Sequence, residues 1–432
     1  MESQIQRWSA KRKVELLLSL IKGEHNVRIH NLDPSQTEGA AGYSRFGLRS
    51  IVTIADTDDP QGTIMHCRKD TSLTKEEREV FRSHLEYEKL SDSVWDLFGE
   101  WVARSTPEVQ FFYLKAYLNT DLVGLGLFLK VKPVDFRTSY SGLRNNALLS
   151  RVAEGLSALV SNCLYVSFRN LITSNLTRPF FFREPGMQAA IMQAFLAWLR
   201  DQPEADMVTI IDTATCDPLY ESAGFRKYAC PSEAYLDVTK YRDVSEYLAE
   251  HRSLRKNLRR AERTVTTSVQ RGPLSAAEVE QVRACVECSV EHSRVNTPCQ
   301  TFFEENIFET EVFNSDKYIH VLVRVEDKIA GFHTFHVCGS HMGGVLGGFN
   351  RAYSRNNCLY ERVILGSLDY AITHGLARVH YSLIDNHTKL RLVESREPCG
   401  LYFFSRNPLN RKVFQLTYRY SDVHKLSALE AG

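Results

Sequence analysis

One order of segments occurs twice in this sequence and restricts the fold more than any other feature. Each time, a predicted hairpin is followed by a strand, a helix and a further strand, over residues 109–237 and again over 317–385. Strands that alternate with helices are typical of mixed α/β domains. Because the order repeats while the two segments share little sequence, we predict two mixed α/β halves in one chain.

The length of 432 residues agrees with this prediction, because it exceeds what one typical core accommodates. Helical patterns are expected near 5–22 and over 74–105, 145–162 and 242–264. The expected parts are an N-terminal extension, helical and irregular, over 1–105, a first domain over 106–240, a basic linker helix within 241–272 and a second domain over 273–432.

Composition narrows the class of protein. The 53 basic and 52 acidic residues leave a net charge of +1, so overall charge predicts no attraction to nucleic acid or membrane. The 10 cysteines are scattered, as expected for reduced thiols in a cytoplasmic protein. No apolar run reaches the roughly 20 residues of a membrane-spanning helix. The short apolar stretch near the N-terminus contains Glu15, which favours an amphipathic helix over a signal peptide.

A first candidate site is the turn "REPGMQ", which connects a strand end to the predicted helix 187–200. A glycine-containing turn that opens a helix exposes unpaired backbone N–H groups, and the helix dipole adds positive potential there. Arg183 adds a cationic fork that suits phosphate. The alternative is an ordinary strand-to-helix turn, in which proline and glycine are common. The candidate residues are Arg183, Gly186, Met187 and Gln188.

A second motif follows the apolar run "MVTIIDTAT": the segment "LYESAGF", with Tyr220, Glu221, Gly224 and Phe225. In this order the two motifs resemble those of the GNAT superfamily of acyl-CoA-dependent transferases. The resemblance implies that the turn at Gly186 grips the CoA pyrophosphate and that Tyr220 protonates the departing thiolate. Gln188 departs from the pattern, because a small residue is usual there. The alternative is that Tyr220 and Phe225 only pack the short helix on the sheet.

A third feature is the basic segment "HRSLRKNLRRAERT", whose cationic residues gather on one face of a helix. Such a stripe suits the phosphates of tRNA or CoA, although charged runs are more often solvated helix faces. With the half that follows, it resembles the FemAB-like and BioF2-like branch of the GNAT fold, in which two GNAT-like halves are joined. The possible phosphate contacts are Arg252, Arg255, Lys256, Arg259, Arg260 and Arg263.

The second half carries weaker signals. His333, His336, Cys338 and His341 are close in sequence, but their spacing on a strand and the lack of a second cluster speak against a metal site. Strand ends and the family resemblance suggest residues that would bind the amine to which the acyl group is transferred. They are His333, His341, Asn350, Tyr360, Asp385 and Lys389.

The resemblance implies an N-acyltransferase that moves an acyl group from acyl-CoA to an amine of a small molecule or amino acid. The amine would attack the thioester directly, with no metal and with Tyr220 as general acid. The alternative donor is aminoacyl-tRNA, held through the basic helix. A further alternative is a GNAT-fold binding module without catalysis. The acyl group, the acceptor, the active half and the oligomeric state stay open.

Overall fold

The structure is a computed structural model of the chain. It describes residues 51–53, 64–82, 92–132, 163–170, 178–261, 264–293, 302–303, 305–353, 357–383 and 387–418. The helices predicted near 5–22 and over 145–162 lie outside these residues, and so do Arg263 and Asp385.

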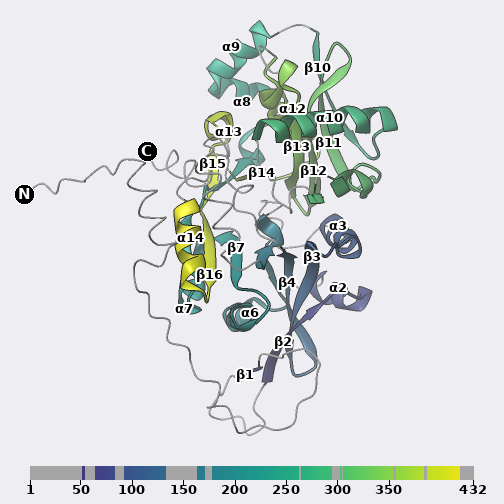
Figure 1. Ribbon diagram of the computed structural model, residues 1–432. Helices are drawn as coiled ribbons and strands as arrows, with labels where there is room; N and C mark the ends of the chain where they lie inside the picture. The colour runs from purple at the N-terminus through teal and green to yellow at the C-terminus, as the bar shows by residue number, and fades with distance from the viewer. Residues whose placement is uncertain are drawn as a thin grey trace, which may run out of the picture. The chain divides into compact units, whose positions relative to one another are not determined.

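The first sheet is built mainly from the first half of the chain (Figure 1). Its path runs β1-β2-β3-β4-β5-β7-β16-β8, and β6 also pairs with β4. Most neighbours are antiparallel, whereas β5 and β7 are parallel. The strands are β1 (Ile51–Thr53), β2 (Ile64–Asp70), β3 (Val109–Leu118), β4 (Asp121–Val131), β5 (Leu164–Ser167), β6 (Phe180–Phe182), β7 (Met207–Thr213), β8 (Arg226–Ala229) and β16 (Cys399–Ser405).

The second sheet has the order β10-β11-β12-β13-β14-β9-β15. Its only parallel pair among the described strands is β13 with β14. The strands are β9 (Glu233–Asp237), β10 (Val265–Arg271), β11 (Tyr318–Val325), β12 (Lys328–Cys338), β13 (His341–Phe349), β14 (Arg378–Leu383) and β15 (Ser395–Glu397).

Strand for strand, the two sheets match. From β2 to β8 in the first and from β10 to β15 in the second, each neighbouring pair has the same relative direction. In both, one long helix connects the two parallel strands, namely α6 (Gln188–Asp201) in the first and α12 (Leu359–Thr373) in the second. The expectation of two mixed α/β halves is therefore confirmed.

Two strands lie in the sheet of the opposite half. β9 precedes the second half in sequence but pairs with β14, and β16 comes near the C-terminus but lies between β7 and β8. The expected parts assigned 233–237 to the first domain and 399–405 to the second, and sheet membership does not follow those boundaries. Each sheet is completed by a strand from the other part of the chain.

Three clusters of buried apolar residues pack the helices against the two sheets. The segment predicted as one helix over 74–105 contains α2 (Lys75–Arg82) and α3 (Asp92–Ala103), and residues 83–91 lie outside the described part. One core packs α3 and the first sheet together with α10 (Ala276–Ser293) and the second sheet. The other two lie under α6 and under α12. Near the C-terminus, α14 (Pro408–Tyr418) lies along β16 (Figure 1).

The basic linker is two helices, and the prediction of one continuous helix over 242–264 is wrong. Asp243 caps α8 (Val244–Glu250) by accepting bonds from the N–H groups of Ser245 and Glu246. His251 then leaves the helical region, with φ −98° and ψ 64°, before α9 (Arg252–Arg260) begins. Within the described residues, no helix is both long enough and apolar enough to span a bilayer.

Candidate functional site

The turn before α6 has the local form that the sequence predicts. Pro185–Met187 makes one 3-10 turn and leads into Gln188, and no side chain caps the helix. The first N–H groups of α6 therefore lack intrahelical partners. Gly186 is exposed, and a β-carbon added to it would meet no atom within 4 Å. The helix thus begins beside open space.

Arg183 stands directly before this turn. Its backbone N–H donates to the Val123 carbonyl at 2.8 Å. Its side-chain Nε is buried and has no hydrogen-bond partner among the described residues. Met187 packs against the core beneath α6, and Gln188 is partly buried. The cation and the helix start are therefore neighbours in sequence, beside β4 of the first sheet.

Tyr220 is buried within the first half. It lies on the short helix α7 (Asp217–Ser222), is 0% exposed, and donates its hydroxyl to Asp212 Oδ2 at 2.9 Å. Its ring stacks on Tyr402 of the exchanged strand β16 with 3.7 Å between centroids. Burial, and next the charge of Asp212, raise its pKa well above the ordinary value. Tyr220 therefore packs α7 on the first sheet and exposes no surface.

In the first half, the space between the parallel strands is filled. The two strands pair only through residues Leu164–Val166 of β5 and Met207–Thr209 of β7. Beyond that, the 3-10 turn Phe168–Asn170 lies against β7. The Asn170 side chain accepts a bond from the Ile211 N–H at 2.9 Å. The 3-10 turn and its bond to β7 therefore occupy the gap where the parallel strands of this half part.

In the second half, no such turn lies between the parallel strands among the residues that the structure describes. β13 and β14 pair from His341↔Arg378 to Gly343↔His380, although β13 continues to Phe349. β13 also has a bulge at Val345, since Phe335 pairs with Gly344 and Thr334 with Leu346. Ser382 on β14 adopts the left-handed region with φ 65°. Strain of this kind is frequent at functional sites.

The same position is interrupted in both halves. In the first, β5 pairs with β4 up to Ser167, and pairing resumes at Phe180. In the second, four paired residues, His341–Gly344, precede the bulge at Val345. A single bulged residue in the second half therefore corresponds to the break in pairing between Ser167 and Phe180 in the first. Gly347, beyond the bulge, is exposed although it lies on an interior strand of the sheet.

Two predicted residues lie near this parting. The His333 ring reaches over β13, because a β-carbon on Gly344 would come within 2.7 Å of its Nε2. Burial, and next the charge of Lys389, lower the pKa of His333 to about 3, so the ring is neutral. Lys389 is itself buried and donates from Nζ to the Leu383 carbonyl at 2.7 Å, at the end of β14.

The other predicted acceptor residues are spread more widely. Asn350 follows β13, where its Oδ1 accepts from the Ala352 N–H at 3.1 Å. Tyr360, in the first turn of α12, packs against Phe349 with 5.5 Å between ring centroids. His341 lies at the opposite end of β13, and Asp385 lies outside the described residues.

A buried chain of polar groups connects the two sheets. Arg169 donates to Glu233 Oε2 at 3.0 Å and to Asp212 Oδ1 at 3.3 Å. Glu233 Oε1 lies 2.9 Å from Nδ1 of His380, and Nε2 of His380 lies 3.2 Å from Nδ1 of His341. Arg169 and Glu233 are both 0% exposed. Asp212 also accepts from Tyr220, so the chain extends from the second sheet to α7.

Sequence reasoning did not identify Arg169, Asp212, Glu233 or His380. The only signal was their position: charged and titratable residues stand inside strand-like runs such as "MVTIIDT" and "RVHYSL". Such residues are costly to bury unless they are paired. In the described part of the chain, no three His, Cys, Asp or Glu side chains are arranged to hold a metal ion.

The basic helix α9 presents its charges to solvent. Arg252, Arg255, Lys256, Arg259 and Arg260 are exposed, while Leu254 is buried. Within the described residues, no ion pair involves these five cations. Arg263 lies outside that part. The predicted one-signed stripe is therefore present over the length of α9.

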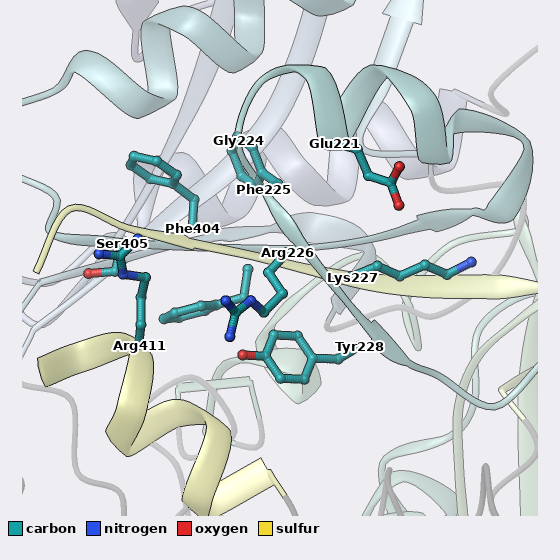
Figure 2. Close-up of a pocket in the computed structure, with 10 residues that line it drawn as sticks. Glu221, Gly224, Phe225, Arg226, Lys227, Tyr228, Phe404, Ser405 and Arg411 are labelled. Atoms are coloured by element: carbon teal, nitrogen blue, oxygen red, sulfur yellow. The ribbon is translucent and has the colours of Figure 1, made fainter. Parts of the chain in front are cut away.

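A cavity of about 400 Å³ borders the end of the second motif (Figure 2). Glu221 and Gly224 come from α7 and the turn after it, Arg226 and Lys227 from β8, and Arg411 from α14. Lys227 forms an ion pair with Asp217. The lining carries both signs of charge and lies at the free edge of the first sheet, away from the parting of β5 and β7.

No protein-family model matches this sequence, and no curated protein matches it either. Several solved structures are similar to it. FemX has a TM-score of 0.48 at 12% identity, with 81% of this chain and 99% of FemX covered. L-PGS from Bacillus licheniformis has 0.46 at 13%, covering 81% and 97%. A tandem GNAT protein from the clavulanic acid biosynthesis pathway has 0.45 at 11%, covering 79% and 99%. In fold, the chain is similar to tandem GNAT and Fem-type proteins.

Proposed function

We propose that this chain is an acyltransferase that joins an acyl or aminoacyl group to an amine, and that the transfer takes place in the second half. The observation that carries the proposal is the parting of β13 and β14 after Gly343↔His380, with the bulge at Val345. Ligands of α/β sheets bind beyond the carboxyl ends of parallel strands. An extended thioester or ester arm fits between two strands that diverge in this way.

The bulge supplies the chemistry that acyl transfer needs. A bulged residue turns its backbone N–H out of the regular ladder. Such a donor beside the parting would stabilise the negative charge that develops on the carbonyl oxygen as the amine attacks. The start of α12, where Cys358 has φ 52° and no side-chain cap, would face the phosphates of the donor.

The first half is proposed to bind phosphate rather than to carry out the reaction. Asn170 bonds across the gap between β5 and β7, so an acyl arm has no place there. The turn at Gly186 and the buried Nε of Arg183 still favour an anion at the start of α6. This retains the expected role of Arg183, Gly186, Met187 and Gln188 as a proposed phosphate site.

Acyl-CoA is the proposed donor, and aminoacyl-tRNA is the second candidate. The observation that favours tRNA is the exposed stripe on α9, whose five described cations lack carboxylate partners within the described residues. Contacts to RNA phosphates release counterions, so binding through the stripe would weaken steeply with salt. Binding of acyl-CoA at a helix start and in a gap between strands would be far less sensitive to salt.

The experiment is calorimetric titration of the full chain with acetyl-CoA and with free CoA. Three proteins are compared: the parent, Gly347→Ile, which adds a branched side chain to β13 against the His333 ring, and Arg183→Glu, which reverses charge at the turn before α6. We expect binding in the parent and a loss of at least tenfold in Gly347→Ile. A loss only in Arg183→Glu would move the donor to the first half.

If the parent binds neither ligand, the acyl-CoA donor is wrong, and aminoacyl-tRNA is tested next at 50 and 200 mM salt. A charge-reversed α9, Arg255→Glu with Arg259→Glu, should then lose affinity. Absence of binding to both donors would favour a binding module without catalysis. Arg226→Glu, in the cavity of Figure 2, serves as the charge-matched control for Arg183→Glu.

A further inference from the structure

The pair His380 and His341 lies where β13 and β14 are still joined, with His380 at the last paired position and His341 two residues earlier on β13. His380 belongs to the last residue pair that joins β14 to β13, and its partner Gly343 has no side chain. The two imidazole rings stack with 5.3 Å between centroids, and Nε2 of His380 lies 3.2 Å from Nδ1 of His341. The ring nitrogens are therefore in hydrogen-bond contact where the proposed acyl group would end.

Exposure increases along this pair towards the surface. Glu233 is 0% exposed and His380 is 1% exposed, whereas His341 is partly exposed. Tyr235 also stacks on His380, with 5.5 Å between centroids, and Arg378 lies over the Tyr235 ring at 4.9 Å. Contacts with Glu233 and Tyr235 thus fix the orientation of the His380 ring. Of the two histidines, the partly exposed His341 is the one that a ligand can reach.

A buried group of charged side chains lies beneath the pair. Arg169 is paired with both Glu233 and Asp212, so with ordinary charges this buried group carries one net negative charge. The neighbouring Tyr220 and Cys399 stay neutral because burial raises their pKa values.

We propose that His341 is the base that receives the amine proton, and that His380 and Glu233 are positioning residues for it. The inference rests on the proposed acyl transfer. His380 donates its Nδ1–H to Glu233 and accepts the Nδ1–H of His341 at Nε2, which makes Nε2 of His341 the proton acceptor. The amine nitrogen forms the new C–N bond, and the donor leaves as a thiolate or alkoxide with the electrons of its broken bond to the acyl carbon. The amine proton goes to His341.

The surroundings of His341 keep it unprotonated before the reaction. Burial, then the charges of His380 and Arg378, lower its pKa to about 4. Cys338 on β12 pairs opposite His341, and burial and the charge of His380 lower the pKa of His336 on the same strand to about 3. At neutral pH His341 is therefore neutral, as a base that receives a proton during the reaction must be.

The test combines nitrogen NMR of the histidine rings with kinetics on the full chain. Parent and His341→Gln, His380→Gln and Glu233→Gln are compared, with His374→Gln, an exposed histidine at the end of α12, as the control. The kinetic probe is acetyl-CoA with a panel of amino acids, polyamines and amino sugars, with products identified by mass spectrometry. Glu233→Asp is added in case Glu233→Gln does not fold.

We expect His341→Gln to lower kcat about a hundredfold while KM for acetyl-CoA changes less than about twofold, as for loss of a general base. Substitution of His380 or Glu233 should shift the pH profile of kcat, a change that loss of packing alone would not produce. The spectra should show His341 with its proton on Nδ1. A kcat of His341→Gln within about threefold of the parent would overturn the inference.

The two proposals fail in different ways. If the parent transfers acetyl groups and His341→Gln does so equally well, only the role of His341 is wrong. If the parent uses no probe amine, acetyl transfer is not the reaction, and the spectra still decide the relay. A proton on Nε2 of His341, or a charged His341 at pH 7, would overturn it in either case.

Discussion

The Oδ1 atom of Asn170 accepts a hydrogen bond from the backbone N–H of Ile211, 2.9 Å away. The same oxygen also accepts from the Ser167 hydroxyl. These bonds close the first half where β5 and β7 part, whereas in the second half a single bulged residue, Val345, stands at the corresponding position. Two halves of matching topology therefore differ at the place where ligands would enter.

Substitution Asn170→Ala should destabilise the fold. It leaves the N–H of the buried Ile211 without a partner, so we expect the free energy of unfolding to fall by about 1–3 kcal/mol. Urea denaturation followed by circular dichroism measures the change. Ser222→Ala is the control, because its hydroxyl bond to Leu219 is exposed and its loss should cost under ~0.5 kcal/mol. Equal effects would argue against the closing role.

Substitution Arg169→Met should have a larger effect. Met fills similar volume but leaves the carboxylates of Asp212 and Glu233 buried without their cation. Breaking a buried pair costs about 3–5 kcal/mol. Arg200→Met, which breaks an exposed pair with Asp201, should cost under ~1 kcal/mol in the same urea series. A small effect of Arg169→Met would mean that water or protons already compensate these charges.

Tyr220→Phe separates packing from catalysis. The ring and its stacking on Tyr402 remain, while the hydroxyl bond to Asp212 is lost. We expect a loss of about 1–3 kcal/mol in unfolding free energy and no change beyond about threefold in kcat. Retained stability with a hundredfold loss of kcat would return Tyr220 to the role of acid for the thiolate. The kinetics and the denaturation should use one protein preparation.

Substitution of alanine should destabilise the protein at one glycine and leave its stability unchanged at another. At Gly348 on β13, a β-carbon would lie 2.9 Å from backbone atoms of Cys285 and Val286 in α10, so strand and helix must separate. We expect Gly348→Ala to cost about 1–3 kcal/mol, as for overpacking. Gly186→Ala meets no atom and should stay within ~0.5 kcal/mol of the parent. Thermal unfolding of both variants beside the parent gives the comparison.

Stability should fall on acidification because of His320. Burial lowers its pKa to about 4, and its Nδ1 lies 3.0 Å from the Thr334 hydroxyl. The unfolded chain binds this proton near pH 6.5, so the contribution is complete above that pH and is lost as the pH falls towards 4. The loss is on the order of 3 kcal/mol. The urea midpoint should change less with pH between 7.5 and 4.5 in His320→Phe than in the parent. An equal pH dependence in both proteins would mean that other groups cause the loss of stability.

Local patterns in the sequence were sufficient for the elements that pack through their own periodicity. The hairpin 109–131, the helix after Gly186 and the helix α12 all show apolar spacing that a strand or helix needs to bury one face. The turn at Pro185 and Gly186 was also predictable, because those residues restrict or free the backbone where they stand. The repeated order of elements predicted two halves for the same reason.

The tertiary structure alone decided which strands pair and which charges meet. A short strand such as β16 carries no local record of its neighbours, so its insertion between β7 and β8 could not be read from its residues. The contact of Arg169 with Glu233 joins residues 64 positions apart, and it depends on that exchange of strands. Hydrogen bonds and charge pairs are set by distance in space, whereas periodicity is set by distance along the chain. For that reason the sequence determined the elements of this protein, and only folding decided its buried charges and the half that stays open.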